Sequence, residues 1–186
     1  MRIISGNLKG KKIVQPNTKN TRPLKDLTKE SIFNIMEHSN LLKFSFEKSV
    51  ILDLFSGVGS FGLECLSRGA KSVIFIENYS ETIKILKKNI QNFNCEKKTK
   101  IITENIFNIR NLAELQKKKF GIIFLDPPYK EKKLTNLLND IISLKLLKKN
   151  GIIIIHRHKK EEEIYPKKFK ILKIKTYGIS KIIFGN

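Results

Sequence analysis

The 186-residue sequence has little cysteine and no long apolar run. Its two cysteines, Cys65 and Cys95, lack the C-x-x-C or histidine-partnered spacing of zinc sites, so we expect neither a disulfide nor a structural metal. Apolar runs such as 121–125 and 152–155 fall far short of the ~18 residues that a membrane-spanning helix needs. The opening MRIISGNLKGKK lacks the apolar stretch of a secretory signal, so we expect a cytoplasmic protein.

Acidic residues are also scarce, with 17 Asp and Glu against 37 Lys and Arg and a formal net charge of +20. Nearly all of the cations are lysine, and the abundance of Lys, Ile and Asn is typical of an AT-rich coding sequence. Part of the lysine content therefore reflects compositional bias. An excess of twenty positive charges on a small domain still attracts polyanions, which indicates a nucleic-acid partner.

From residue 46 onward, strand-like and helix-like segments alternate. Runs of Ile, Val, Phe and Leu indicate strands buried on both faces, as in a parallel sheet covered by helices. The expected strands are 50–55, 71–77, 99–104, 120–126 and 151–156, with crossover helices at 60–68, 80–93, 108–118 and 131–146. The tail adds two strands without room for a helix between them, so they should pair antiparallel at one sheet edge. The pattern predicts an open α/β doubly wound fold.

Residues 1–45 are expected to form an N-terminal extension of the domain at 46–186. RIIS and KKIV, joined around Gly6 and Gly10, predict a basic β-hairpin. A polar segment with a proline at each end follows. The apolar spacing after it predicts a helix over about 26–37.

The segment DLFSGVGSFGLE at 53–64 is the candidate cofactor loop, because ligands of open parallel sheets bind beyond the carboxyl ends of the strands. Gly57, Gly59 and Gly62 have G-x-G-x-x-G spacing directly after a strand and at the start of a helix. Glycines allow a sharp turn and a close approach of the ligand. Glu77 ends the next strand, where a carboxylate can accept both hydroxyl hydrogens of an adenosine ribose.

Two cofactors fit this arrangement, a nicotinamide dinucleotide and S-adenosyl-L-methionine. A dinucleotide would place its pyrophosphate on the loop, where the carboxylate of Asp53 is electrostatically unfavourable. S-adenosylmethionine carries an ammonium and a sulfonium, so the same carboxylate is favourable. We therefore expect the methyl donor.

The most specific motif is DPPY at 126–129, at the end of the fourth expected parallel strand. Two prolines stiffen the segment and remove two N–H groups, so Asp126 and the carbonyl of Pro127 are held as acceptors. Such acceptors orient the exocyclic amino group of a nucleobase and stabilise its developing positive charge. With Pro128 completing the turn and Tyr129 stacking on a base turned out of its helix, the motif predicts amino-group methylation.

His156 and His158 flank Arg157 after the fifth expected strand. They resemble a metal or acid/base pair, but two histidines at alternating positions without an evident acidic partner are more typical of a strand end. We therefore interpret this segment as a charged strand exit.

The order of the glycine loop, IE at 76–77 and DPPY resembles class I S-adenosylmethionine-dependent methyltransferases that modify nucleobase amino groups. MRIISGNLKGKKI, TRP at 21–23, KESIFNIM at 29–36, LSRGA at 66–70 and YG at 177–178 resemble, more narrowly, the RsmD-type bacterial 16S rRNA guanine-N2 methyltransferases. This resemblance implies a Rossmann-like, mostly parallel seven-stranded sheet with an antiparallel C-terminal edge strand. It also implies methyl transfer to one guanine N2 of 16S rRNA in the small ribosomal subunit, with the protein acting as a monomer.

The resemblance also assigns residues. It implies that the DPPY residues are catalytic and that Glu104 or, in our interpretation, Asn105 contacts the adenine. The implied cofactor contacts are Asp53, Phe55, Gly57, Gly59, Gly62, Glu77, Asn105 and Asp126, and the implied RNA contacts are Arg2, Lys9, Lys11, Lys12 and Arg22.

Three alternatives stay open at this point. DPPY also serves N6-adenine DNA methyltransferases, although 186 residues leave no room for a large target-recognition segment. A non-catalytic RNA-binding or ribosome assembly factor would not need a carboxylate beside a polyanion. An oxidoreductase would bind a nicotinamide cofactor instead of S-adenosylmethionine.

Overall fold

The structure is a computed structural model that describes residues 1–16, 24, 26–39, 46–107 and 112–186. Several predictions fall on the intervening residues and so lie outside the described part. They are the RNA contact of Arg22, the TRP segment, the end of the N-terminal extension at residue 45, and the start of the helix expected at 108–118.

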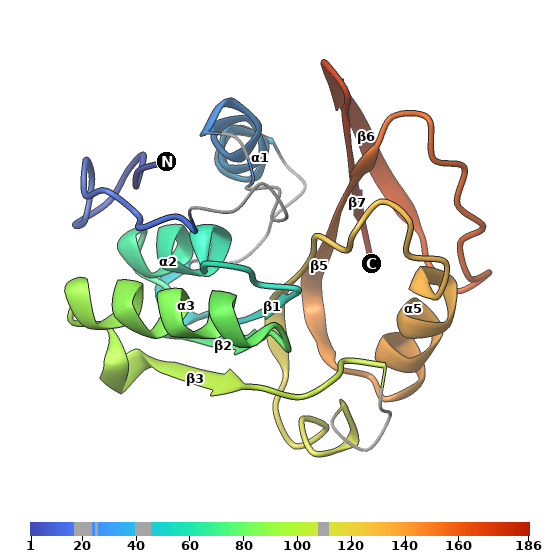
Figure 1. Cartoon of the computed structure of the whole chain (residues 1–186). Helices are drawn as coiled ribbons and strands as arrows, with labels where there is room; N and C mark the ends of the chain where they lie inside the picture. The colour runs from blue at the N-terminus through green and yellow to red at the C-terminus, as the bar shows by residue number, and fades with distance from the viewer. Residues whose placement is uncertain (17–23, 25, 40–45, 108–111) are drawn as a thin grey trace.

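A seven-stranded sheet forms the centre of the molecule (Figure 1). Its strands are β1 (Val50–Leu54), β2 (Ser72–Ile76), β3 (Thr99–Ile102), β4 (Phe120–Leu125), β5 (Leu147–His158), β6 (Ile171–Tyr177) and β7 (Ser180–Gly185). Their order is β3-β2-β1-β4-β5-β7-β6. The first five are parallel, and β7 runs antiparallel between β5 and the edge strand β6. The expected α/β doubly wound fold is confirmed.

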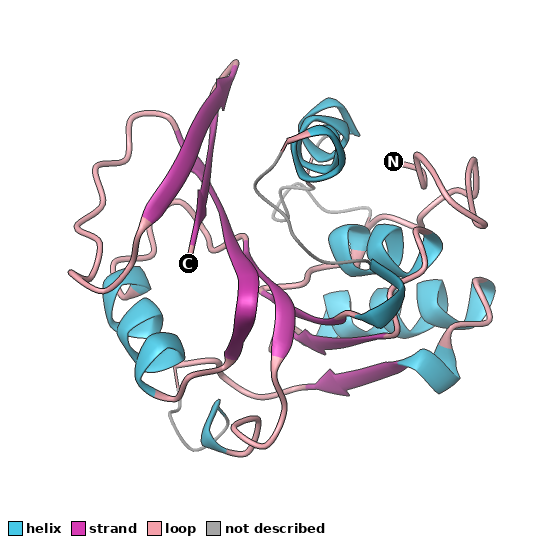
Figure 2. Ribbon diagram, turned by 180° about the vertical axis from the view of Figure 1, so that it is seen from behind, coloured by secondary structure: helices cyan, strands magenta, loops and turns pink. Residues whose placement is uncertain are grey.

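Helices cover both faces of this sheet, as the buried apolar strands require. One core cluster joins the sheet to α1 (Asp26–His38), α2 (Ser60–Ser67) and α3 (Ser80–Asn92). A second cluster joins the opposite face to α5 (Leu134–Ser143). Figure 2 shows α5 on the far side of the sheet from α2 and α3. Short 3-10 turns at Phe46–Lys48 and Glu96–Lys98 precede β1 and β3.

The strand order reverses at β1, because β2 lies on one side of it and β4 on the other. In open α/β sheets a ligand cleft forms beyond the carboxyl ends of the strands at such a point. The residues that follow β1, β2, β3 and β4 therefore meet at one edge of the sheet.

The expected N-terminal β-hairpin is not found. Within residues 1–16 a single isolated bridge joins Arg2 to Lys12, and neither predicted strand forms. Backbone hydrogen bonds still join the two arms, from the amides of Ile3, Gly10 and Ile13 to the carbonyls of Lys11, Ile3 and Met1, but other amides have partners outside the segment, which interrupts the ladder. Those of Ile4 and Ser5 donate to the two carboxylate oxygens of Glu64 in α2, at 2.8 and 2.9 Å.

Further contacts hold this segment against α2. The amide of Leu8 donates to the hydroxyl of Ser67 at 2.9 Å. Gly6 has a φ of +82°, and a Cβ there would lie 1.9 Å from the Ser67 carbonyl oxygen, so only glycine fits. Ile3 and Ile13 are buried in the same core cluster as α2. The first residues of the chain are thus packed on the domain.

A buried lysine of α1 completes this attachment. The ammonium of Lys29 donates to the Arg2 carbonyl at 2.8 Å and lies 3.4 Å from the Glu64 carboxylate. Burial lowers the pKa of Lys29, while Glu64 and Asp26 oppose that effect. Among the described helices, none has both the length and the apolar character needed to cross a membrane.

Candidate active site

Three adjoining cavities lie at the carboxyl edge of the sheet, with volumes of about 520, 310 and 80 Å³. Phe55, the first residue after β1, lines all three. Glu77 and Pro128 line the two larger ones, and Asp126 lines the largest and the smallest. The cavities therefore form one cleft shared by the glycine loop and the DPPY segment.

The glycine loop turns tightly away from β1. Phe55 has a φ of +59°, which is unusual for a residue with a side chain, and Gly57 and Gly59 also have positive φ. The Ser56 amide donates to the Ile76 carbonyl at 3.0 Å, and the Gly59 amide donates to the Ser56 carbonyl at 2.8 Å. These bonds fix the loop above the ends of β1 and β2.

The three glycines have different surroundings. A Cβ on Gly57 would meet nothing within 4 Å, so its backbone is open toward the cleft. A Cβ on Gly62 would lie 2.3 Å from the ring of Phe75, and one on Gly59 would lie 2.5 Å from Leu86. Gly59 and Gly62 thus allow α2 to pack closely, and Gly57 is the glycine that lines the cleft.

Asp53 is a buried carboxylate beneath this loop, with 1% of its surface exposed. Its Oδ2 accepts a hydrogen bond from the Gly62 amide at 2.9 Å. Its Oδ1 is buried and has no hydrogen-bond partner among the described residues. Burial is the main cause that raises the pKa of Asp53 well above its ordinary value. Such an oxygen, beside the 80 Å³ cavity, suits a cationic hydrogen-bond donor.

Glu77 directly follows β2 and lies between the two larger cavities. Its Oε2 accepts from the Gly57 amide at 2.8 Å, and its Oε1 accepts from the amides of Asn78 and Tyr79 at 2.9 and 3.0 Å. These amides hold the carboxylate in one orientation. Each carboxylate oxygen has two lone pairs and Oε1 already accepts two bonds, so Oε2 retains one acceptor site for a ribose hydroxyl.

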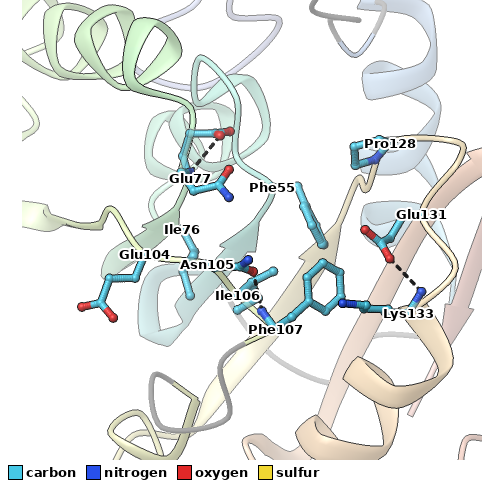
Figure 3. Close-up of a pocket in the computed structure, with 11 residues that line it drawn as sticks. Phe55, Ile76, Glu77, Glu104, Asn105, Ile106, Phe107, Pro128, Glu131 and Lys133 are labelled. Carbon is cyan, nitrogen blue, oxygen red and sulfur yellow. Dashed lines mark hydrogen bonds between the residues drawn. The ribbon is translucent and has the colours of Figure 1, made fainter.

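The 310 Å³ cavity follows β3 and is shown in Figure 3. Asn105 lines it, and its Oδ1 accepts from the Phe107 amide at 3.0 Å. The rings of Phe55 and Phe107 lie 5.8 Å apart, and the Lys133 ammonium is 5.6 Å from the Phe107 ring. A cavity with aromatic walls and an amide side chain suits a purine. Glu104 also lines it.

Asp126 and the DPPY segment form the opposite wall of the largest cavity. Asp126, Pro127, Pro128 and Tyr129 all line it, as the motif predicted from its place after β4. The Tyr129 ring meets the His158 ring edge-on, with centroids 4.9 Å apart and an interplanar angle of 77°.

Arg157 holds this segment in place from β5. Its guanidinium donates to the carbonyls of Pro128, Tyr129 and Glu131 at 2.8, 3.1 and 3.1 Å, and it pairs with Glu163. Only 1% of Arg157 is exposed. The expected charged strand exit is therefore wrong for Arg157, because β5 continues to His158 and the arginine is buried behind the DPPY loop.

The predicted charged strand exit is also wrong for His156. It is 2% exposed, and its Nδ1 lies 2.8 Å from Oδ1 of Asp126. Its Nε2 lies 2.9 Å from the hydroxyl of Ser180 on β7. Its acidic partner is the residue directly after β4, 30 residues earlier in the chain. The described residues contain no group of three or more His, Cys, Asp or Glu that could hold a metal ion.

The side chains of the cleft fit S-adenosylmethionine. Asp53 offers a buried acceptor to a cation, Gly57 allows close approach, and Glu77 offers a carboxylate to a ribose hydroxyl. A pyrophosphate on this loop would instead face the carboxylates of Asp53 and Glu77. The donor set therefore disfavours a dinucleotide.

The predicted RNA contacts among the described residues do not line the cleft, although Met1 of the same segment lines its smallest cavity. Arg2, Lys9, Lys11 and Lys12 are exposed on the N-terminal segment, which packs on α2. The ammonium of Lys11 lies 5.6 Å from the ring of Phe93. None of the four lines the three cavities.

Sequence reasoning missed several residues of the site. Phe107, Glu131 and Lys133 line the 310 Å³ cavity, and His156 and Arg157 support the DPPY segment. The aromatic Phe107 soon after an expected strand end was an available signal. The other contacts depend on loop paths and on strand neighbours, which no local pattern reveals.

Comparisons with known proteins agree with this geometry. The model of the family described as "Conserved hypothetical protein 95" matches residues 1–186. The chain is 36% identical over 173 residues to ribosomal RNA small subunit methyltransferase D of Buchnera aphidicola subsp. Acyrthosiphon pisum, covering 93% of this chain and 86% of the relative. It is 35% identical over 185 residues to the protein of the same name from Haemophilus influenzae, covering 96% and 90%.

Solved structures show the same fold. The structure of HI0767 from Haemophilus influenzae has a TM-score of 0.73 and 30% identity, covering 99% of this chain and 96% of that chain. The rRNA methyltransferase aviRa from Streptomyces viridochromogenes has a TM-score of 0.69 and 14% identity, covering 92% and 88%. The second likeness concerns the fold alone.

Proposed function

This chain belongs to the family described as "Conserved hypothetical protein 95", and we propose on that premise that it methylates the N2 amino group of one guanine in 16S rRNA. It is an S-adenosylmethionine-dependent methyltransferase of small-subunit rRNA, like the relatives that carry that name. The choice of guanine N2 is the finer part of the proposal. It rests on the DPPY segment, which suits an exocyclic amino group.

The observation that carries the proposal is the position of Asp126. Its carboxylate lines both the largest cavity and the small cavity of Asp53, so it borders the cofactor loop and the DPPY wall together. S-adenosylmethionine, when bound, supplies a methyl group on a positively charged sulfur. Asp126 and the Pro127 carbonyl would accept the two amino hydrogens and direct the nitrogen lone pair toward that methyl group.

The transfer forms an N–C bond, breaks an S–C bond and leaves one excess proton on the nitrogen. Asp126 stabilises the resulting positive charge and is placed to accept the proton on its way to solvent. Tyr129 offers an aromatic surface to a base turned into the cavity. Arg157 keeps the carbonyls of this loop in fixed positions.

We assign the cofactor contacts to Asp53, Phe55, Gly57, Glu77, Asn105 and Asp126, with Gly59 and Gly62 supporting the loop through packing. Arg2, Lys9, Lys11 and Lys12 would bind the RNA backbone, because they are exposed on one segment of a chain with a net charge of +20. All cleft residues come from one chain, so a monomer suffices. Ribosomal RNA as substrate implies a cytoplasmic location.

The N6-adenine DNA methyltransferase alternative shares DPPY, but the relatives carrying the rRNA name match along nearly the whole chain. An intact, buried cofactor carboxylate argues against a purely RNA-binding factor. Both alternatives remain outcomes of the decisive experiment.

In that experiment, small ribosomal subunits that lack their natural methyl groups are incubated with the protein and labelled S-adenosylmethionine. Naked 16S rRNA and duplex DNA are tested in parallel, and the labelled nucleosides are identified. We expect N2-methylguanosine in rRNA. Label in DNA as N6-methyladenine would overturn the proposal in favour of the DNA enzyme, and cofactor binding without label in any substrate would favour the non-catalytic factor.

A further inference from the structure

We propose that His156 is a positioning residue that fixes the orientation of the Asp126 carboxylate, and that Ser180 in turn fixes the His156 ring. This inference deepens the proposed methyl transfer and rests on it. Its basis is a chain of two side-chain contacts that crosses three neighbouring segments of the sheet. The contacts are Asp126 to His156 at 2.8 Å and His156 to Ser180 at 2.9 Å.

The strand register explains why these residues meet. Leu125 at the end of β4 pairs with Ile155 of β5, so the next residue on each segment is Asp126 and His156. On the other side of β5, β7 begins at Ser180 and pairs with the last residues of β5. The three side chains therefore lie in a row across the carboxyl edge of the sheet.

The histidine and the serine of this row are buried, so they depend on one another for hydrogen-bond partners. His156 is 2% exposed and Ser180 is 7% exposed, whereas the Asp126 side chain retains 16% exposure at the cleft. A buried imidazole requires partners for its polar nitrogens, and both of its nitrogens have them here. The reacting end of the row is Asp126, because it lines the largest cavity.

Hydrogen-bond chemistry determines which groups donate and which accept along this row. An ionised carboxylate only accepts, so the ring nitrogen facing Asp126 must be Nδ1–H. In the neutral ring Nε2 then accepts from the Ser180 hydroxyl, which selects that tautomer. The Nδ1–H bond restrains rotation of the carboxylate, so Asp126 presents the same face to each incoming amino group.

Orientation of the acceptor matters for this reaction, because the nitrogen lone pair must line up with the methyl group and its sulfur. A carboxylate free to rotate would still bind the amino group but would align it less often. The expected consequence of losing His156 is therefore a fall in kcat with little change in the KM for cofactor or RNA.

Two substitutions separate the two contacts of the ring. His156→Asn places an amide nitrogen at the same number of bonds from Cβ as Nδ1, so it can still donate to Asp126. His156→Gln places its polar atoms near the Nε2 position, so it can reach Ser180 and loses the Asp126 donor. His38→Gln, on an exposed histidine of α1, is the matched control.

We expect His156→Gln to lower kcat by about 10- to 100-fold, the size of effect that misplacing a reacting group produces. His156→Asn should remain within about threefold of the wild type, and Ser180→Ala should fall between them. Calorimetry should show unchanged cofactor affinity in all three, and thermal unfolding should show that each is folded. Equal activity of the Asn and Gln variants would overturn the proposal.

A second measurement does not depend on any variant or on turnover. The ring nitrogens of ¹⁵N-labelled wild-type protein report the tautomer by nuclear magnetic resonance. We expect a protonated Nδ1 on His156, and a neutral ring protonated on Nε2 would overturn the proposal even if a variant failed to fold. Failure of the proposed function is seen separately, because wild-type protein would then label no rRNA.

Discussion

The guanidinium of Arg157 donates a hydrogen bond to the carbonyl oxygen of Pro128 across 2.8 Å. It thereby connects β5 to the DPPY segment from behind, on the side away from solvent. The same side chain reaches the carbonyls of Tyr129 and Glu131 and pairs with Glu163. The buried Arg157 side chain thus holds the loop that follows Asp126 in place.

Arg157→Lys tests this support. Lysine keeps the positive charge but has no planar fork, so it cannot satisfy three carbonyls and Glu163 together. We expect kcat to fall about tenfold or more, and the free energy of unfolding to fall by about 1–3 kcal/mol because buried acceptors lose their donors. Urea unfolding and methyl-transfer assays check both values. Lys118→Arg, a Lys/Arg exchange at an exposed position, is the control, and an unchanged Arg157→Lys protein would contradict the assigned role.

Asp126→Asn tests the reacting carboxylate. The amide keeps the size of the side chain but removes the negative charge that stabilises the methylated amino group. We expect methyl transfer to fall roughly 10²-fold or more, a much larger loss than the change in cofactor affinity measured by calorimetry, because Asp126 is only one of several cofactor contacts. Asp140→Asn on α5 is the matched control. Wild-type turnover in Asp126→Asn would remove the basis for assigning DPPY as the catalytic motif.

Asp53→Asn should affect stability and cofactor binding in opposite directions. Burial raises the pKa of Asp53 in the folded protein. At pH values between the unfolded and folded pKa, the unfolded chain therefore binds fewer protons than the folded one, and the free energy of unfolding falls as pH rises. Asparagine removes this penalty. Without cofactor, the stability of the variant relative to wild type should increase from pH 4 to pH 8, as urea unfolding at several pH values would show.

With cofactor, the same substitution removes a charged acceptor. We expect the affinity of Asp53→Asn for S-adenosylmethionine to fall about 10- to 100-fold, the value of a hydrogen bond to a charged group. Titration calorimetry at pH 7.5 measures this directly. Unaltered affinity would show that the buried Oδ1 does not meet the cation of the ligand.

Gly57→Ala and Gly62→Ala should separate binding from packing. A Cβ on Gly62 meets Phe75 at 2.3 Å, so we expect a loss of about 1–3 kcal/mol in stability from overpacking. A Cβ on Gly57 meets open space, but it narrows the cleft and strains a φ of +54°. Its main effect should be weaker cofactor binding. Equal losses of stability in the two variants would contradict the distinction.

The exposed lysines of the N-terminal segment can be tested against lysines elsewhere. Replacing Lys9, Lys11 and Lys12 by Ala should weaken RNA binding and lower the slope of log K against log salt by about 0.7–0.9 for each lost phosphate contact. The control variant replaces the exposed Lys118, Lys148 and Lys149, which lie near the amino ends of β4 and β5. Equal slopes in the two variants would show that the N-terminal lysines contribute to RNA binding only through the net charge of the protein.

The periodicity of the sequence was enough to predict the sheet. Continuous apolar runs indicated strands buried on both faces, and parallel strands bring the residues after them to one edge. For that reason Asp53, Glu77 and Asp126 could be expected to meet, and they line one cleft. The expected helix over 26–37 is confirmed as α1.

The failures have a common physical cause. RIIS and KKIV have strand-like composition, but two amides of RIIS bind Glu64 in α2, about 60 residues away, and the Val14 amide of KKIV binds Asn89 in α3, 75 residues away. The sequence around His156 did not indicate its acidic partner, which is Asp126, the residue directly after the neighbouring strand β4. Local patterns measure what a segment prefers alone, and in both cases a distant side chain supplied a stronger interaction.

The attachment of Ile4 and Ser5 to Glu64 also sets the order in which the molecule is assembled during synthesis. The first residues to leave the ribosome cannot reach their final partners until α2 has been made, 60 residues later. Until then Ile3 has no core to enter, and two backbone amides stay hydrated. The packing of the N-terminal segment therefore waits for α2, and contacts of such long range slow folding.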